Sequence, residues 1–164
     1  MTRRILSFLI CLTTLDSYGV SNGPTSVTLP PKIRKQFLMD MRDHLSAISE
    51  IQVALAGGRF NLAANIAEDR IGLGSSSSEA CRMPDTPTYN EKESTTQTNN
   101  YELSKFMPEA MHKIGFNMHA AADQFARDAR KAAKTQNYQM TIASLSKITT
   151  QCVACHTKFK LNNR

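Results

Sequence analysis

Two cysteines and a histidine near the end of the chain have the spacing that most directly suggests chemistry. Cys152 and Cys155 are separated by two residues and His156 follows at once, which gives a Cys-x-x-Cys-His motif. On a helix, residues three apart lie on one face, so each thiol can form a thioether with one vinyl group of a haem. The adjacent imidazole can then bind the iron as an axial ligand. The motif predicts one covalently bound haem c.

Other uses of the cysteine pair agree less well with the sequence. A dithiol redox centre usually opens a helix after a strand, where the helix N-terminus lowers a thiol pKa, whereas this pair closes a helical pattern. A structural zinc site needs further ligands at matching spacing, and neither a second Cys-x-x-Cys nor a His-x-x-x-His occurs. A dithiol oxidoreductase remains the alternative from the enzyme class.

The first residues of the chain are similar to a secretory leader. Arg3 and Arg4 supply a basic start, and residues 5–15 form an apolar run too short to span a bilayer. We expect residues 1–19 to be a signal peptide, cleaved after Gly19, and we expect no membrane span later in the chain. Haem c is attached on the outer side of the energised membrane in bacteria. The leader and the motif therefore predict a periplasmic protein.

Two helices are expected in the first half of the chain. Pro31 is a suitable first residue for one, and Gly57-Gly58 ends it. Asn61 is the expected N-cap of the other, which stops at residues 72–74. The apolar stripe of the first helix is formed by Leu38, Met41, Leu45, Ile48 and Leu55, with Phe37 and Ile51 beside it.

Two more helices are expected in the second half. One begins near Pro108 with Glu109 in its first turn, after a separate turn at residues 101–107, and the last follows Asn137. In the last helix, helical spacing places both thiols on the core-facing stripe of Leu145, Ile148, Cys152, Cys155 and Phe159. The haem is therefore expected in the interior.

These elements predict an all-α fold. No strand pattern or internal repeat occurs, and short links join the first helix to the second and the third to the fourth. The economical arrangement is an antiparallel up-down-up-down four-helix bundle over residues 31–164. Residues 20–30 are expected to be a linker. Residues 74–100 are rich in Ser, Thr, Asn and Pro without any period, which predicts a flexible loop.

Charge is distributed unevenly along the chain, whose formal net charge is +6. No Asp or Glu occurs from residue 129 onward, where the basic residues are Arg130, Lys131, Lys134, Lys147, Lys158, Lys160 and Arg164. This asymmetry predicts a basic rim around the haem that attracts an acidic redox partner, although a solvated helix face has the same composition. Nucleic acid is not an expected partner, because the chain carries no groove-reading motif.

Over residues 31–164 the chain resembles class II c-type cytochromes, the cytochrome c prime family. The resemblance is carried by Met41-Arg42-Asp-His44-Leu45, by Met107-Pro108 and by Cys152-Val-Ala-Cys155-His156-Thr-Lys-Phe159-Lys160. It implies a four-helix bundle in which both motif cysteines bind haem c and His156 is the proximal ligand. Leu38, Phe159 and Lys160 would lie near the haem, and relatives often have an arginine at the position of Lys160. Homodimers are frequent in similar proteins.

The side of the iron opposite His156 decides the function. Low-spin members of the family have a methionine ligand from the first helix, whereas high-spin members leave an apolar distal side. Met41 lies near the haem-bearing end of a bundle, one turn from Leu38, and is the expected sixth ligand because a soft thioether suits haem iron. Met107 and Met111 are rivals, and Leu38 would face the site if no ligand bound.

The expected function is the transfer of single electrons between redox partner proteins, which is not an enzymatic activity. The alternative is a five-coordinate haem that binds nitric oxide or another small gas in an apolar pocket behind Leu38 and Phe37. His44, His112 and His119 have no sequence neighbour that marks them as ligands, so surface or hydrogen-bonded positions are expected. Cys81 has no partner for an internal disulfide once the motif cysteines bind haem.

Overall fold

The computed structural model describes residues 23–82 and 101–162, and within them the fold is mostly helical. The expected signal peptide at residues 1–19 lies outside the described residues. The elements in chain order are β1 (Thr25–Val27), α1 (Pro31–Ala56), α2 (Phe60–Arg70), the 3-10 helix η1 (Ser76–Cys81), α4 (Glu109–Thr135), α5 (Tyr138–Lys158) and β2 (Phe159–Leu161). A helical turn at residues 101–104 precedes α4. The all-α prediction is confirmed at this level.

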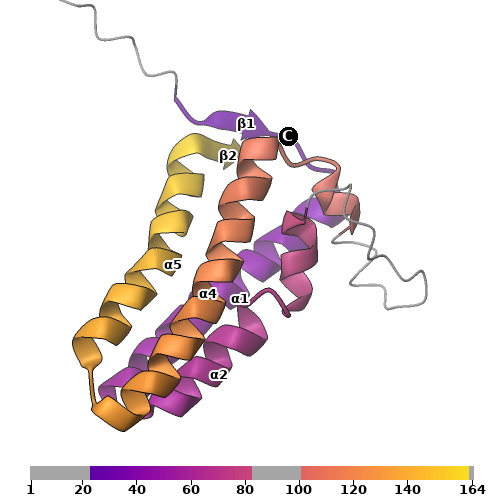
Figure 1. The fold of residues 1–164 in the computed structure, drawn as a ribbon. Helices are drawn as coiled ribbons and strands as arrows, with labels where there is room; N and C mark the ends of the chain where they lie inside the picture. The colour runs from indigo at the N-terminus through magenta and orange to yellow at the C-terminus, as the bar shows by residue number, and fades with distance from the viewer. Residues whose placement is uncertain (1–22, 83–100, 163–164) are drawn as a thin grey trace, which may run out of the picture.

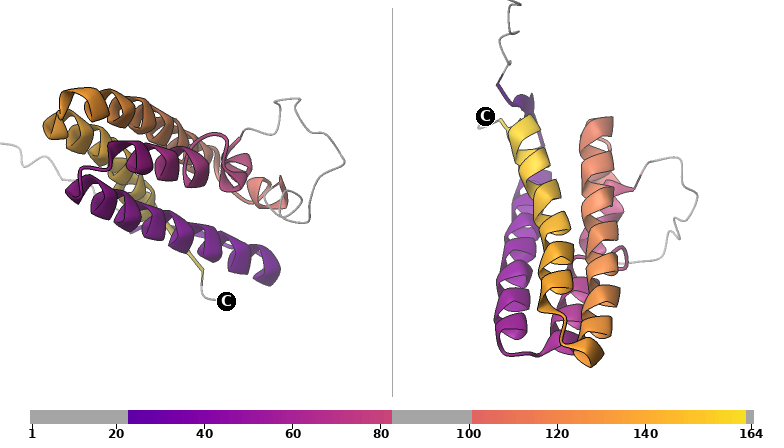
Figure 2. Two further views of the ribbon diagram at one scale, coloured as in Figure 1. Left: turned by 90° about the horizontal axis from the view of Figure 1, so that it is seen from below. Right: turned by 60° about the vertical axis from the view of Figure 1, so that its left-hand side comes forward.

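The helices pack in the order of the chain. α1 lies against α2, α2 against α4 and α4 against α5, and successive helices run in opposite directions (Figure 1). The start of α1, η1, the start of α4 and the end of α5 therefore lie at one end of the molecule, as the views of Figure 2 also show. None of the helices within residues 23–82 and 101–162 is long and apolar enough to cross a membrane.

Local signals set most of the helix ends. α1 begins with Pro31 as predicted, and Gly58, at φ 69°, supplies the left-handed turn after it. Asn137 caps α5, because its side-chain oxygen accepts a hydrogen bond of 2.9 Å from the backbone N–H of Met140. α4 begins at Glu109, directly after Pro108, as predicted.

The start of α2 differs from the prediction, because Asn61 is inside the helix and does not cap it. The chain turns earlier, where the backbone N–H of Arg59 donates to the carbonyl of Ala54 at 2.8 Å. Phe60 then begins the helix, 1% exposed, with its ring 4.7 Å from that of Tyr138. Burial of this aromatic ring against another helix therefore decides where α2 starts.

Two clusters of buried side chains hold the elements together. The larger runs between the helices, where many alanines let the backbones approach closely around Ile51, Phe60, Phe125 and Ile148. The smaller lies at the end that carries the motif and contains Val27, Leu29, Ile33, Ala80, Leu103, Met107, Met111 and Phe159. Leu45, expected on the core stripe of α1, is 71% exposed. The stripe from Leu38 to Ile48 borders a cavity, and other residues of α1 fill the core.

A short parallel sheet occurs where the sequence predicted no strands. β1 lies in the expected linker, and β2 begins at Phe159, which was expected to continue the last helix. β1 pairs with β2 so that Thr25 is opposite Phe159 and Val27 opposite Leu161. Val27 is 4% exposed and Phe159 7% exposed. Strands of three residues have no detectable alternation, so a pairing between the two ends of the chain leaves no local signal.

The prediction of a flexible loop over residues 74–100 is wrong for residues 76–81. Residues 76–81 form η1, in which Ser78 and Ala80 are buried. The hydroxyl of Ser78 donates to the carbonyls of Leu73 and Ser75, at 2.7 and 2.8 Å. A serine-rich segment can thus satisfy its own backbone and become compact. Residues 83–100 lie outside the described part of the chain.

Candidate functional site

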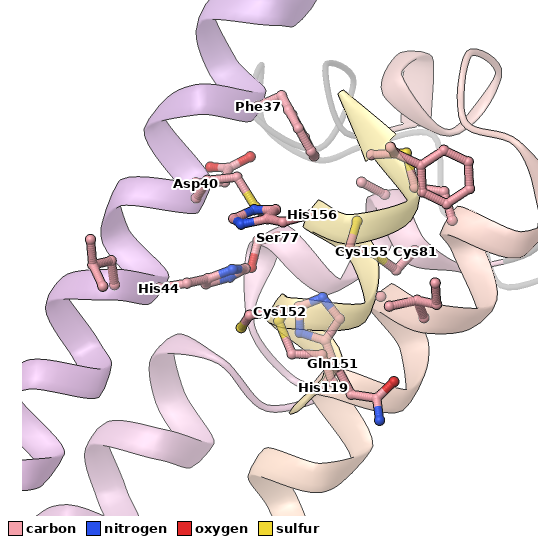
Figure 3. Close-up of a pocket in the computed structure, with 18 of the residues that line it drawn as sticks. Phe37, Asp40, His44, Ser77, Cys81, His119, Gln151, Cys152, Cys155 and His156 are labelled. Carbon is pink, nitrogen blue, oxygen red and sulfur yellow. The ribbon is translucent and has the colours of Figure 1, made fainter. Parts of the chain in front are cut away.

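A cavity of about 620 Å³ lies between α1, η1, α4 and the end of α5 (Figure 3). Its wall is mostly apolar and contains side chains from α1 and α4 that face the motif on α5. Cofactor sites in proteins have volumes of about 300–1,000 Å³ and are lined mainly by apolar groups with a few polar ones. The cavity therefore has the size and lining of a site for a large apolar cofactor.

The motif residues lie together in the wall of this cavity. Cys152 and Cys155 are half-buried, and His156 is exposed at its border. All belong to the last two turns of α5, which ends at Lys158 because Phe159 adopts an extended backbone and enters β2. The sheet thus fixes the position of the helix end. The prediction that both thiols face inward is confirmed.

The thiols are in an environment that keeps them protonated. Burial raises the pKa of Cys152 and, with a smaller effect from Cys152, the pKa of Cys155. Burial, followed by smaller effects of Cys155 and Asp40, raises the pKa of Cys81 to about 12. A redox-active dithiol needs the opposite shift, because the thiolate is the nucleophile. The two thiols therefore lack the lowered pKa that is typical of cysteines active in thiol–disulfide exchange.

Side chains of α1 face the motif across the cavity. Met41, Leu38 and Phe37 line it, and each is half-buried. In Figure 3, Phe37 and Asp40 project from α1 toward the part of the site that holds His156. The structure thus brings Met41 and His156 to the same cavity, as expected for residues from the start of the first helix and the end of the last.

The rival methionines also reach the cavity. Met107, just before α4, and Met111, in its first turn, line the cavity, and both are buried. Met118 also lines it, about two turns beyond Met111 on α4. Phe159 and Lys160, the other residues expected near the haem, border it from β2; Phe159 is buried and Lys160 exposed.

The histidines outside the motif are more deeply buried than a surface position would allow. His44 is 6%, His112 3% and His119 1% exposed. Each ring makes one hydrogen bond, and each keeps one buried nitrogen without a hydrogen-bond partner. His44 and His119 line the cavity, whereas His112 lines a neighbouring pocket. The expected hydrogen bonds are therefore present at only one of the two nitrogens of each ring.

The sequence gives no local sign of how these two cavity histidines are held, because their partners are distant in the chain. His44 Nε2 lies 2.8 Å from the hydroxyl of Ser77, and His119 Nδ1 lies 2.5 Å from the carbonyl oxygen of Ile71. Helical spacing could have indicated that His44 lies near the expected ligand, since it is three residues after Met41 and such residues are neighbours on a helix.

The expected basic rim is smaller than the sequence indicated. Arg130, Lys131 and Lys134 are near the end of α4, at the opposite end of the molecule from the cavity (Figure 1). Arg130 is also paired there with Glu68. Lys158 and Lys160 are exposed at the cavity end. An antiparallel helix pair separates residues that are close in sequence, which explains the difference.

Residues in the cavity fit a haem better than a metal ion alone. Among residues 23–82 and 101–162, no three His, Cys, Asp or Glu side chains converge to hold a metal ion. A covalent haem needs less from the protein: two thiols on one helix face, one imidazole beside them and an apolar wall, all of which are present. Comparisons with protein-family models, with curated proteins and with solved structures found no match.

Proposed function

We propose that the chain is an exported monohaem c-type cytochrome that carries single electrons between redox partner proteins. The observation that carries this proposal is the convergence of Cys152, Cys155 and His156 on one apolar cavity of about 620 Å³, which Met41 of α1 also lines. In this proposal the four helices form an up-down-up-down bundle that encloses haem c, as in the family that the sequence resembles.

The residues of the cavity would have separate tasks. The thiols of Cys152 and Cys155 anchor the porphyrin, and His156 supplies the proximal nitrogen to the iron. When bound, the haem supplies a centre that accepts and releases one electron. Met41 supplies a thioether sulfur from α1, which raises the reduction potential relative to a second nitrogen ligand. Leu38 and Phe159 exclude water from the site.

The surface around the motif suits contact with another protein. His156 and the neighbouring Lys158 and Lys160 are exposed, so the motif lies near the surface of the cavity end. Basic side chains at this position would attract an acidic docking surface and increase the rate of encounter at low salt. Two lysines carry this part of the proposal, because Arg130, Lys131 and Lys134 lie at the opposite end of the molecule.

The absorption spectrum of the pyridine haemochrome tests the proposal. Exported wild-type protein should contain one haem that stays with the polypeptide after extraction with acidified acetone. Cys152→Ala and Cys155→Ala should each leave a single thioether, which shifts the haemochrome band, and the double variant should lose the pigment on extraction. Cys81→Ala is the matched control and should keep both thioethers. Colourless wild-type protein would refute the proposal.

A five-coordinate haem that binds nitric oxide or another small gas is the second candidate. It is favoured by Leu38 and Phe37, which supply apolar carbon to the same wall as Met41. A high-spin ferric spectrum would select this function. A dithiol oxidoreductase is not proposed, because burial raises the pKa of both motif thiols.

A further inference from the structure

The imidazole of His119 is held in one tautomer. Its Nδ1 lies 2.5 Å from the carbonyl oxygen of Ile71, and a carbonyl can only accept, so Nδ1 carries the hydrogen. Nε2 is then an unprotonated nitrogen with a free lone pair. This nitrogen is buried, has no hydrogen-bond partner and belongs to a residue in the wall of the cavity.

His44 lies beside His119 in the same wall. Their ring centroids are 5.6 Å apart with an interplanar angle of 77°. His44 is held by Ser77 of η1 through Nε2, and its Nδ1 has no partner. Figure 3 shows the two rings at the inner part of the cavity, near Cys152 of α5. Two neutral bases therefore adjoin the place where the porphyrin would be anchored.

We propose that His119 Nε2 binds a proton when the haem is reduced, so that electron transfer by this protein is coupled to proton uptake. This inference rests on the proposed function, because it requires a one-electron centre in the cavity. The step balances as one electron received from the redox partner protein and one proton received from water. No other bond forms or breaks, and reoxidation releases both.

The coupling follows from charge. Reduction removes one unit of positive charge from the cavity, and this raises the affinity of a nearby base for a proton. By linkage, a proton on that base stabilises the reduced form by the same amount. Both rings lie in a low-dielectric wall, where such interactions are stronger than in water.

The surroundings make His119 the better proton acceptor of the pair. The Ile71 carbonyl and the carboxylate of Asp123 raise its pKa, although burial has the larger effect and the net shift is downward. Burial, followed by the effect of His119, lowers the pKa of His44 to about 4. The charged and titratable groups facing the rings are Asp43 on α1, Arg70 at the end of α2, Arg82 after η1, Asp123 on α4 and Cys152 on α5.

Measurement of the reduction potential against pH tests the proposal. In wild-type holoprotein the potential should fall as pH rises through the interval between the His119 pKa of the oxidised state and the higher pKa of the reduced state, and it should be flat outside this interval. A tenfold difference in proton affinity between the redox states corresponds to about 59 mV. His119→Asn keeps a donor for the Ile71 carbonyl and removes Nε2, so this variant should lose the slope.

His112→Gln is the matched control. His112 is also buried, is also bonded to a backbone carbonyl, that of Ser104, and also has an unpartnered nitrogen, but it lies outside the cavity. Its variant should keep the wild-type slope. Equal slopes in wild-type and His119→Asn proteins would overturn the proposal, as would loss of the slope in His112→Gln alone.

A second measurement avoids dependence on the folding of any one variant. ¹⁵N resonances of the imidazoles in wild-type holoprotein should show His119 protonated at a higher pH in the reduced state than in the oxidised state. A titration midpoint that is the same in both states would overturn the proposal. Absence of haem from wild-type protein would instead refute the proposed function itself, so the haemochrome is measured first.

Discussion

The backbone of Thr25 pairs with that of Phe159, which joins the start of the described chain to the residue that follows the helix of the motif. This pairing ends α5 at Lys158, two residues after His156. It also places the Phe159 ring in the buried cluster at the cavity end, beside Val27 and Met111. The position of the motif therefore depends on contacts with a segment about 130 residues earlier, for which the sequence predicts only a linker.

Replacement of Phe159 should destabilise the protein. Phe159→Ala removes a ring that is 7% exposed and should lower the free energy of unfolding by about 3 kcal/mol, because it leaves a cavity in the cluster. Urea unfolding of the holoprotein measures the loss. Lys160→Ala, at the next and exposed position, should change stability by less than about 0.5 kcal/mol. Similar losses in both variants would contradict the prediction.

Replacement of Met41 tests the sixth ligand. Met41→Leu preserves volume and removes the sulfur, so the ferric spectrum should change from low spin to high spin and the reduction potential should fall. Met39→Leu is the control, since Met39 is 49% exposed on the same helix and does not line the cavity. A wild-type protein that is already high spin, with a spectrum insensitive to Met41→Leu, would select the gas-binding alternative.

The stability of the protein should decrease as the solution becomes acidic. Burial, with a smaller effect of His119, lowers the pKa of His44 from 6.5 to about 4, so between these values the unfolded chain binds more protons than the folded one. The contribution of His44 is fully present above pH 6.5 and is lost as pH falls toward 4, and it amounts to about 3 kcal/mol.

Comparison with His44→Gln isolates this contribution from that of other groups. The variant keeps a side-chain amide near Ser77 and has no titration, so its free energy of unfolding should depend less on pH than that of the wild type. The two proteins should therefore converge in stability as pH falls from 6.5 to 4. Parallel curves in urea unfolding over this range would contradict the prediction.

Glycine is required at position 72 because two helices approach closely there. A Cβ at Gly72 would meet the carboxylate of Asp123 and the carbonyl oxygen of Glu68. Gly72→Ala should therefore destabilise the protein by about 1–3 kcal/mol through overpacking. Gly74→Ala is the matched control, since a Cβ there has no neighbour within 4 Å. Thermal unfolding compares the two, and an equal effect would show that chain flexibility, not space, matters at these positions.

Helix positions and the chemistry of the motif could be predicted from the sequence because they depend on neighbours in the chain. Pro31 and Asn137 mark helix starts through backbone geometry and a single capping bond. The three-residue separation of Cys152 and Cys155 places them on one helix face wherever the helix lies. Each of these features is determined by residues that are only a few positions apart in the chain.

The tertiary structure alone decided which residues surround the motif. The partners of His44 and His119 are 33 and 48 residues away. The strand that follows α5 pairs with one from the other end of the described chain. Leu45, whose spacing fits the core, is exposed at the border of the cavity. Each of these features depends on which surfaces meet after the helices pack. A pattern of spacing states which side chains share a face, but the packing of distant segments determines what that face contacts.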